Sequence, residues 1–251
     1  AIINRMGFNS IGLEAFLENV RQLAPGVIHG INIGKNAATP LEQATDDYLA
    51  CLDAVYPFAD YVTINISSPN TRDLRSLQED RALDDLLAAV STKADDLGKA
   101  SGKRVPLVLK VAPDLEDNQI TAIATLVGRH GIDGIAATNT TSSRQGVGDD
   151  KLAAESGGLS GPPVRSGATR VIAALHAELG NTVPIIGIGG IDSAESALEK
   201  LSAGASLLQL YTGLIYQGPG LVGTVVNGLA GACNSAGYGT DYNQWLHALH
   251  G

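Results

Sequence analysis

The sequence has little of what secreted or metal-binding proteins rely on. Its 251 residues include only two cysteines, Cys51 and Cys233, which lie far apart and form no CxxC motif. Such a pair supports neither a disulfide framework nor a metal site built on cysteine. None of the five histidines forms an HxxxH or HExxH pair, so we expect no metal ion.

Positive charge and long apolar runs are also scarce. Lysine and arginine total 17 against 26 aspartates and glutamates, which gives a net charge of −9. Because no basic run could follow a phosphate backbone, we do not expect nucleic acid as a partner. No apolar run reaches the ~18 residues of a membrane-spanning helix and no signal peptide is visible, so we expect this chain itself to be soluble.

What the chain does have is a regular alternation of apolar, β-branched runs with amphipathic segments. The predicted strands occupy residues 27–33, 61–66, 105–111, 134–138, 183–187 and 206–211. The predicted helices occupy residues 12–22, 41–55, 83–97, 117–130, 164–179 and 193–202. Thr39 and Asp192 are the predicted N-caps of two of these helices, because Glu42 and Glu195 stand at the matching capping-box positions.

This alternation predicts an α/β fold with a parallel sheet and right-handed crossovers. The strands recur about every 36 residues, close to the spacing in a TIM (β/α)8-type barrel, whose eight units take ~250 residues. Only six units are visible, and residues 1–9 resemble an active-site loop more than a chain terminus. We therefore expect about six of the eight βα units, in a chain that begins in the middle of a barrel. An open six-stranded sheet is the competing interpretation.

The most informative segment, residues 61–70, reads Tyr-Val-Thr-Ile-Asn-Ile-Ser-Ser-Pro-Asn. It begins as a buried strand and ends in uncharged amides and hydroxyls. These groups suit a polar, planar heterocycle better than a metal or a phosphate. The same composition is about equally typical of a turn that closes a strand.

Polar residues end most of the other predicted strands as well. Asn32, Lys110 and Thr138 interrupt apolar runs at positions that meet at one edge of a parallel barrel, where catalytic groups gather. Glycine-containing loops at 187–190 and 211–213 follow the last two strands, where barrels bind phosphate. Taken singly, Lys110 could equally extend to solvent, and glycine pairs also serve tight turns.

Seven motifs together resemble those of dihydroorotate dehydrogenases, specifically the quinone-linked class. They are NRMGFN (4–9), GINIGKN (30–36), NISSPNT (65–71), KVAPD (110–114), TNT (138–140), GGLSG (157–161) and GIGGI (187–191). The resemblance runs from residue 1 to about residue 220. Ser68 points to the quinone-linked class, because the soluble class has cysteine at that place.

By this resemblance, residues 1–251 are a single FMN-binding barrel domain that oxidises (S)-dihydroorotate to orotate in de novo pyrimidine biosynthesis. The implied mechanism passes a hydride to N5 of FMN and a proton to Ser68 as the general base, and a quinone reoxidises the flavin. The resemblance assigns the pyrimidine to Asn4, Arg5, Met6, Gly7, Phe8, Asn65, Asn70, Asn139 and Thr140. It assigns FMN to Asn32, Asn65, Lys110, Thr138, Gly161, Gly190, Tyr211 and Thr212.

The chain departs from the family pattern at its start. The first two barrel strands, a lysine that follows the first of them, and the helical pair that forms the quinone tunnel are not found. Peripheral contact with the cytoplasmic face of the cell membrane is expected of the full-length protein, through that missing segment only. Because two sheet edges would be unpaired, we expect residues 1–251 alone to bind FMN weakly or not at all.

Two alternatives stay open. One is a non-catalytic barrel remnant that binds flavin or phosphate and needs a partner to supply the missing strands. The other is an FMN barrel of the soluble class, which uses fumarate or NAD. Ser68 argues against the second alternative.

Overall fold

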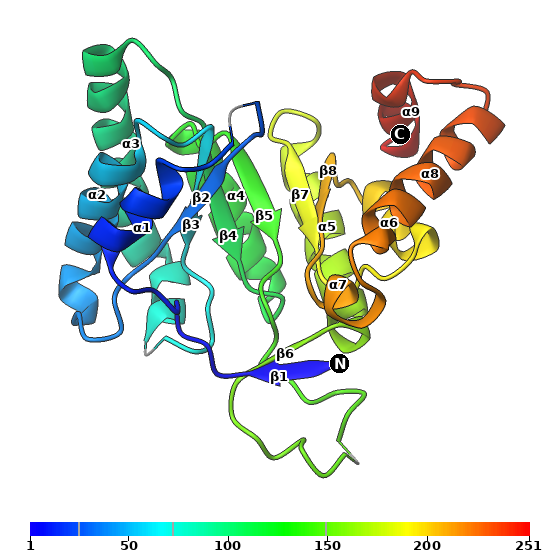
Figure 1. The fold of residues 1–251 in the computed structure, drawn as a ribbon, viewed down its shortest axis with the longest axis horizontal. Coiled ribbons are helices and arrows are strands. Elements are labelled where there is room, and N and C mark those ends of the chain that lie inside the picture. The colour runs from blue at the N-terminus through cyan, green and yellow to red at the C-terminus, as the bar shows by residue number, and fades with distance from the viewer. Residues whose placement is uncertain (25, 72, 149) are drawn as a thin grey trace.

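A six-stranded parallel sheet forms the centre of the computed structural model, which describes residues 1–24, 26–71, 73–148 and 150–251 (Figure 1). Its strands are β2 (Gly30–Ile33), β3 (Tyr61–Asn65), β4 (Leu107–Val111), β5 (Gly134–Ala137), β7 (Ile185–Ile188) and β8 (Leu207–Gln209). They pair in the order β2-β3-β4-β5-β7-β8, so each strand of the sheet lies beside the next one along the chain.

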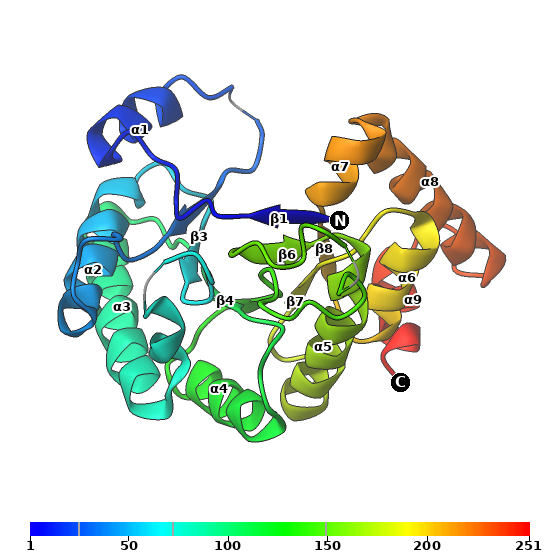
Figure 2. The same cartoon turned by 90° about the horizontal axis from the view of Figure 1, so that it is seen from below.

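The helices between these strands form an arc around one face of the sheet (Figure 2). They are α2 (Ala44–Val55), α3 (Asp80–Ser101), α4 (Asp117–Arg129), α5 (Arg165–Leu179) and α6 (Ala194–Ser202). Right-handed crossovers in sequential order place every helix on the same face, and the sheet curls away from them as a barrel does. The predicted barrel-type fold with six βα units is confirmed. The sheet is a half-barrel, because its end strands β2 and β8 are not paired with each other.

The core lies between the sheet and the arc of helices. One row of paired residues crosses the sheet on its outer face, and all of its members are buried: Ile33, Ile64, Leu109, Ile135 and Ile185. Because side chains alternate along a strand, the row one residue further on faces the inside of the half-barrel. That inner row places Asn65 directly beside Lys110 and so brings polar groups to the inside.

A short antiparallel ribbon lies across the carboxyl ends of the strands (Figure 2). It pairs β1 (Ile2–Asn4) with β6 (Gly158–Ser160), and the pairing joins segments more than 150 residues apart. Neither strand was predicted, because three-residue strands carry almost no periodicity and depend on a distant partner. Residues 158–160, which belong to the GGLSG motif, therefore form a paired strand.

Several element boundaries also differ from the prediction. The segment 41–55 is a 3-10 turn, Leu41–Gln43, followed by α2, and Thr39 does not cap it. The N-cap of α6 is Ser193 rather than Asp192, whose carboxylate pairs with Arg165. The remaining helices are α1 (Leu13–Val20), α7 (Thr212–Gln217), α8 (Gly220–Ser235) and α9 (Tyr242–Leu249).

Two further 3-10 turns, η2 (Leu74–Gln78) and η3 (Pro162–Val164), shape the loops at the carboxyl edge of the sheet.

Over the part of the chain that the structure describes, no helix combines the length and apolar character needed to cross a membrane.

Candidate functional site

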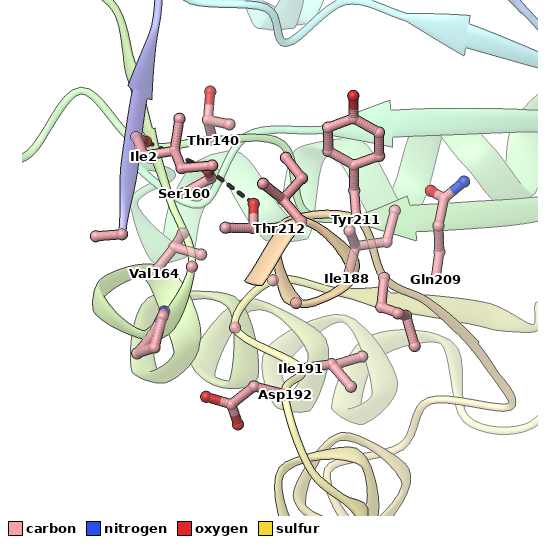
Figure 3. A pocket seen from close by; sticks show the side chains of 18 of the residues that line it. Ile2, Thr140, Ser160, Val164, Ile188, Ile191, Asp192, Gln209, Tyr211 and Thr212 are labelled. Carbon is pink, nitrogen blue, oxygen red and sulfur yellow. Dashed lines mark hydrogen bonds between the residues drawn. The ribbon is translucent and has the colours of Figure 1, made fainter. Parts of the chain in front are cut away.

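A cavity of about 710 Å³ opens at the carboxyl ends of the sheet, beneath the β1–β6 ribbon. This volume lies within the range of small-molecule and cofactor sites. Ten of the predicted site residues line it: Asn4, Met6, Lys110, Thr138, Asn139, Thr140, Gly161, Gly190, Tyr211 and Thr212. In Figure 3, Ile2, Thr140 and Ser160 lie on one side of this cavity, and Ile188, Gln209 and Tyr211 lie on the other.

Four residues at the ends of β3 and β5 form a hydrogen-bonded group that we call the amide cluster: Asn65, Ser67, Asn139 and Thr140. The Asn139 side chain donates to Asn65 Oδ1 over 3.3 Å and to Ser67 Oγ over 3.1 Å. Asn139 Oδ1 in turn accepts from the Thr140 backbone N–H over 2.8 Å. The β3 and β5 loops, which are far apart in sequence, therefore hold each other's amides in fixed orientations.

The opening segment of the chain docks on the loop after β3. The Asn70 side chain donates to Asn4 Oδ1 over 3.0 Å and to the Met6 carbonyl oxygen over 3.3 Å. Gly7 passes so close that an added Cβ would lie 2.9 Å from the Asn70 carbonyl oxygen. The Phe8 ring covers Gly34, where an added Cβ would meet it at 2.6 Å. These contacts bring Asn4, Met6 and Asn70 to the same edge of the cavity.

Ser68 lies within this edge, but it does not line the cavity itself. Its side chain is buried, and its hydroxyl accepts a hydrogen bond from the Asn70 N–H over 3.3 Å. Residues 66–70 thus form a turn after β3, and this turn also brings its polar groups to the edge of the cavity. Nearby, the Thr71 hydroxyl is buried without a hydrogen-bond partner among the described residues, although buried hydroxyls are ordinarily paired.

Lys110 carries a positive charge in the inner row of the sheet and lines the cavity. No hydrogen bond or ion pair joins its ammonium to any residue that the structure places. Burial lowers the pKa of Lys110, because a desolvated ammonium is penalised in its charged form. An unpaired, partly desolvated cation of this kind favours a ligand that brings negative charge.

The opposite side of the cavity, which we call the glycine side, is built from Gly161, Gly189, Gly190 and Thr212. The three glycines have φ values of 92°, 115° and 73°, a backbone conformation that other residues rarely adopt. The Thr212 hydroxyl donates to Ser160 Oγ over 2.9 Å, which joins the start of α7 to the ribbon (Figure 3). This side therefore presents mainly backbone to a ligand.

Seven predicted site residues do not line the cavity: Arg5, Gly7, Phe8, Asn32, Asn65, Ser68 and Asn70. Of these, Arg5 and Asn32 also make none of the contacts described above. Arg5 forms an exposed ion pair with Glu155. Asn32 lies exposed on the end strand β2, paired in register with Thr63 and separated from β5 by two other strands. Conversely, Gln209 and Asp192 line the cavity but were not predicted. Gln209 has a signal, since it is the polar residue in the apolar run Leu-Leu-Gln-Leu (207–210), whereas the sequence around Asp192 predicts a helix cap.

Comparisons with known proteins give a consistent result. The family model for dihydroorotate dehydrogenase matches residues 1–232. A "Dihydroorotate dehydrogenase (quinone)" of Chromobacterium violaceum is 59% identical over 223 residues, which cover 89% of this chain and 65% of that protein. A protein of the same name from Polaromonas naphthalenivorans is 54% identical over 236 residues, covering 91% of this chain and 67% of the relative. The chain thus spans about two thirds of the length of these curated relatives.

Solved structures agree with the sequence comparison. The ligand-free dihydroorotate dehydrogenase from Eimeria tenella is similar with a TM-score of 0.87 and 35% identity, covering 94% of this chain and 70% of that one. The complex of the Eimeria tenella enzyme with ferulenol gives a TM-score of 0.86 and 34% identity, covering 94% and 68% of the two chains.

Proposed function

Because this chain belongs to the dihydroorotate dehydrogenase family, quinone class, we propose that it carries the site at which dihydroorotate is oxidised to orotate. The proposal includes FMN as cofactor, a quinone as the final electron acceptor and a place in de novo pyrimidine biosynthesis. The observation that carries it is that Asn139 and Thr140 of the uncharged amide cluster line the same cavity as Lys110, whose ammonium has no partner among the described residues. The quinone is supported by the names of the relatives, whereas contact with the cytoplasmic face of the membrane rests on the resemblance alone.

The residues of the cavity fit FMN. Within the described part of the chain, Lys110 has no partner for its charge, and a reduced flavin carries negative charge that an ammonium stabilises. The glycine side offers both backbone without Cβ atoms and the Thr212 hydroxyl, which suits phosphate recognition. When bound, FMN would supply the acceptor for the hydride, and Lys110, Thr138, Gly161, Gly190, Tyr211 and Thr212 would hold it.

The amide side fits a pyrimidine. Orotate presents alternating carbonyl and N–H groups, and each asparagine offers both a donor and an acceptor. Because Asn65, Asn139 and Asn70 are fixed by hydrogen bonds, their free donors and acceptors have set directions. A ring with the wrong pattern would leave these groups unpaired, which is a strong basis for selectivity.

Ser68 is the residue that we assign to proton transfer. Its Oγ would take the proton from C5 of dihydroorotate as a general base. The hydroxyl hydrogen of Ser68 is not donated to any described residue, so it is available to pass onward as the proton is taken. The nearby unpaired Thr71 hydroxyl is a suitable next group in that path. This role requires the carbonyl next to C5 to acidify the substrate, because serine is a weak base at neutral pH.

The test is reduction of a quinone analogue by the purified full-length protein supplied with dihydroorotate and FMN. We expect orotate to form in step with the reduced quinone. One observation favours the alternative, a flavin- or phosphate-binding remnant: Leu207 on β8 remains 59% exposed, and each end strand has only one neighbour. Flavin binding without orotate formation would support that alternative and contradict the proposal.

A further inference from the structure

Arg75 lies on η2, directly behind the amide cluster, and it is absent from the lining of the cavity. Its guanidinium donates in three directions. Nε donates to the Ser67 carbonyl oxygen over 3.2 Å, and Nη2 donates to the Thr140 carbonyl oxygen over 2.9 Å. Nη1 donates to Asp114 Oδ2 over 2.8 Å and to Ser142 Oγ over 3.3 Å. One planar group therefore connects the loops that follow β3, β4 and β5.

The carboxylate of Asp114 completes this arrangement from the loop after β4. It accepts from the Thr141 hydroxyl and, over 3.0 Å, from the Ser142 backbone N–H. Burial raises the pKa of Asp114, but the hydrogen bonds from Thr141, Ser142 and Arg75 outweigh burial and leave the pKa below its usual value. The carboxylate is therefore charged at neutral pH and balances the guanidinium that it contacts.

A second side chain of η2 fixes the position from which Arg75 reaches out. Gln78 is buried, and its Oε1 accepts from the Ala112 N–H at the end of β4 over 3.0 Å. Its Nε2 donates to the Arg75 carbonyl oxygen over 3.5 Å. The base of the arginine is thereby tied to the same strand that carries Lys110.

We propose that Arg75 is a positioning residue for the substrate side of the cavity, a role that rests on the proposed function. Arg75 holds the backbone carbonyls of Ser67 and Thr140, two members of the amide cluster. It thereby fixes the backbone that carries this cluster and the adjacent Ser68. Lysine cannot replace it, because a single ammonium cannot reach two loop carbonyls and a carboxylate in the directions of a rigid fork. The contacts of Arg75 given above involve no residue of the glycine side, where Arg165 instead donates to the Gly190 carbonyl oxygen over 2.9 Å. We therefore expect the effect of Arg75 to be confined to substrate.

The experiment compares Arg75→Lys with Arg170→Lys in the FMN-loaded full-length protein. Arg170 is the matched control, because it also pairs with an aspartate, Asp117, and with a loop carbonyl, that of Leu115, but away from the cavity. Orotate binding is measured by the change that it causes in the flavin absorbance spectrum. We expect Arg75→Lys to raise the orotate Kd at least tenfold with unchanged FMN content, and Arg170→Lys to change neither quantity.

A second variant, Asp114→Asn, keeps the size of the side chain and removes its charge. We expect a smaller rise in the orotate Kd, and an effect in the double variant that is less than the product of the two single effects, since both act through one contact. The inference is overturned if Arg75→Lys binds orotate within twofold of wild type. It is equally overturned if FMN content and orotate binding fall together. Failure of the wild-type protein to bind orotate would instead contradict the proposed function itself.

Discussion

The two sides of the cavity are built by different means. The amide side consists of side chains that hydrogen-bond one another, as in the contacts of Asn139 with Asn65 and Ser67. The glycine side consists largely of backbone whose positive φ values exclude most side chains. Recognition by side chains is altered when a donor becomes an acceptor, whereas recognition by backbone is altered when a Cβ is added. The two sides should therefore fail separately, in substrate binding and in cofactor binding.

Replacing the proposed base should have the largest effect. We expect Ser68→Ala to lower kcat for dihydroorotate by ~10²–10⁴-fold, the usual contribution of general-base catalysis. Orotate affinity and FMN content should change little, because among the described residues the Ser68 hydroxyl makes only one hydrogen bond, with the Asn70 N–H. Steady-state assays at neutral pH measure this effect.

The neighbouring Ser67→Ala is the matched control for that variant. It removes an acceptor of Asn139 within the amide cluster, so it should weaken orotate binding more than it lowers kcat. Full dihydroorotate oxidation by Ser68→Ala at neutral pH would remove Ser68 from the mechanism.

The next largest effect should come from reversing a donor on the amide side. Asn139→Asp places a carboxylate oxygen where Nδ2 now donates to Asn65 Oδ1. Leaving such partners unmatched costs ~1–3 kcal/mol, so the orotate Kd should rise by about 5- to 150-fold. Flavin titration should show unchanged FMN affinity. A parallel loss of FMN would mean that the two sides are not independent.

On the glycine side, Gly190→Ala should act on FMN alone. The residue has a φ of 73°, and an added Cβ would lie 2.6 Å from the Arg165 Cβ. A left-handed alanine costs ~1–2 kcal/mol, so we expect FMN affinity to fall by about 5- to 30-fold. Gly223→Ala is the control, because its added Cβ meets nothing within 4 Å. Equal FMN affinity in the two variants would contradict a cofactor role for this loop.

The smallest effect concerns a buried lysine behind the glycine side. Lys200 is fully buried, its Nζ donates to the Arg165 carbonyl oxygen over 2.7 Å, and burial lowers its pKa to about 8. Between that value and the ordinary 10.5, the unfolded chain binds more protons than the folded one. The free energy of unfolding contributed by Lys200 should therefore rise as pH increases through this window.

The Tm of wild type and of Lys200→Met, measured at about pH 7.5 and at about pH 10, gives that contribution. Burial raises the pKa values of Tyr48, Cys51 and Cys233, and these shifts lower the stability of the folded protein as pH rises. They are common to both proteins, so the contribution of Lys200 is the difference in Tm between wild type and Lys200→Met. From the lower to the higher pH, we expect the Tm of wild type to rise by a few °C relative to that of Lys200→Met, since ~1 kcal/mol corresponds to ~2–4 °C in a domain of this size. An identical pH dependence of Tm in both proteins would contradict the lowered pKa of Lys200.

Much of the fold could be predicted because it depends on local pattern. The central strands and the helices that cover them follow from runs such as 61–66 and 117–130, and the middle of each of these elements lies where the sequence predicts it. The ends of the elements were less predictable. Val27 and Ile28 look like strand residues but are exposed and precede β2, and Asp192 looks like a helix cap but pairs with Arg165. In both cases a tertiary contact, or its absence, outweighed a local preference.

For the candidate site, polar residues at strand ends together with the family resemblance predicted ten residues of the cavity lining. Asp114 ends the KVAPD motif, but neither Asp114 nor Arg75 was assigned a role, because a charged residue in a loop is ordinarily solvated. Their importance appears only when the loops after β3, β4 and β5 are brought together and their carbonyl groups converge on one guanidinium.

The order of apolar and polar residues along the chain by itself determined the parallel, helix-covered sheet and the edge at which its amides gather, because strand direction and side-chain alternation are local properties. Only the tertiary structure decided that the β1–β6 ribbon covers this edge, that Asn32 and Arg5 lie away from it, and that Arg75 binds its loops together. These features arise from contacts between segments distant in sequence, whose geometry no local pattern encodes.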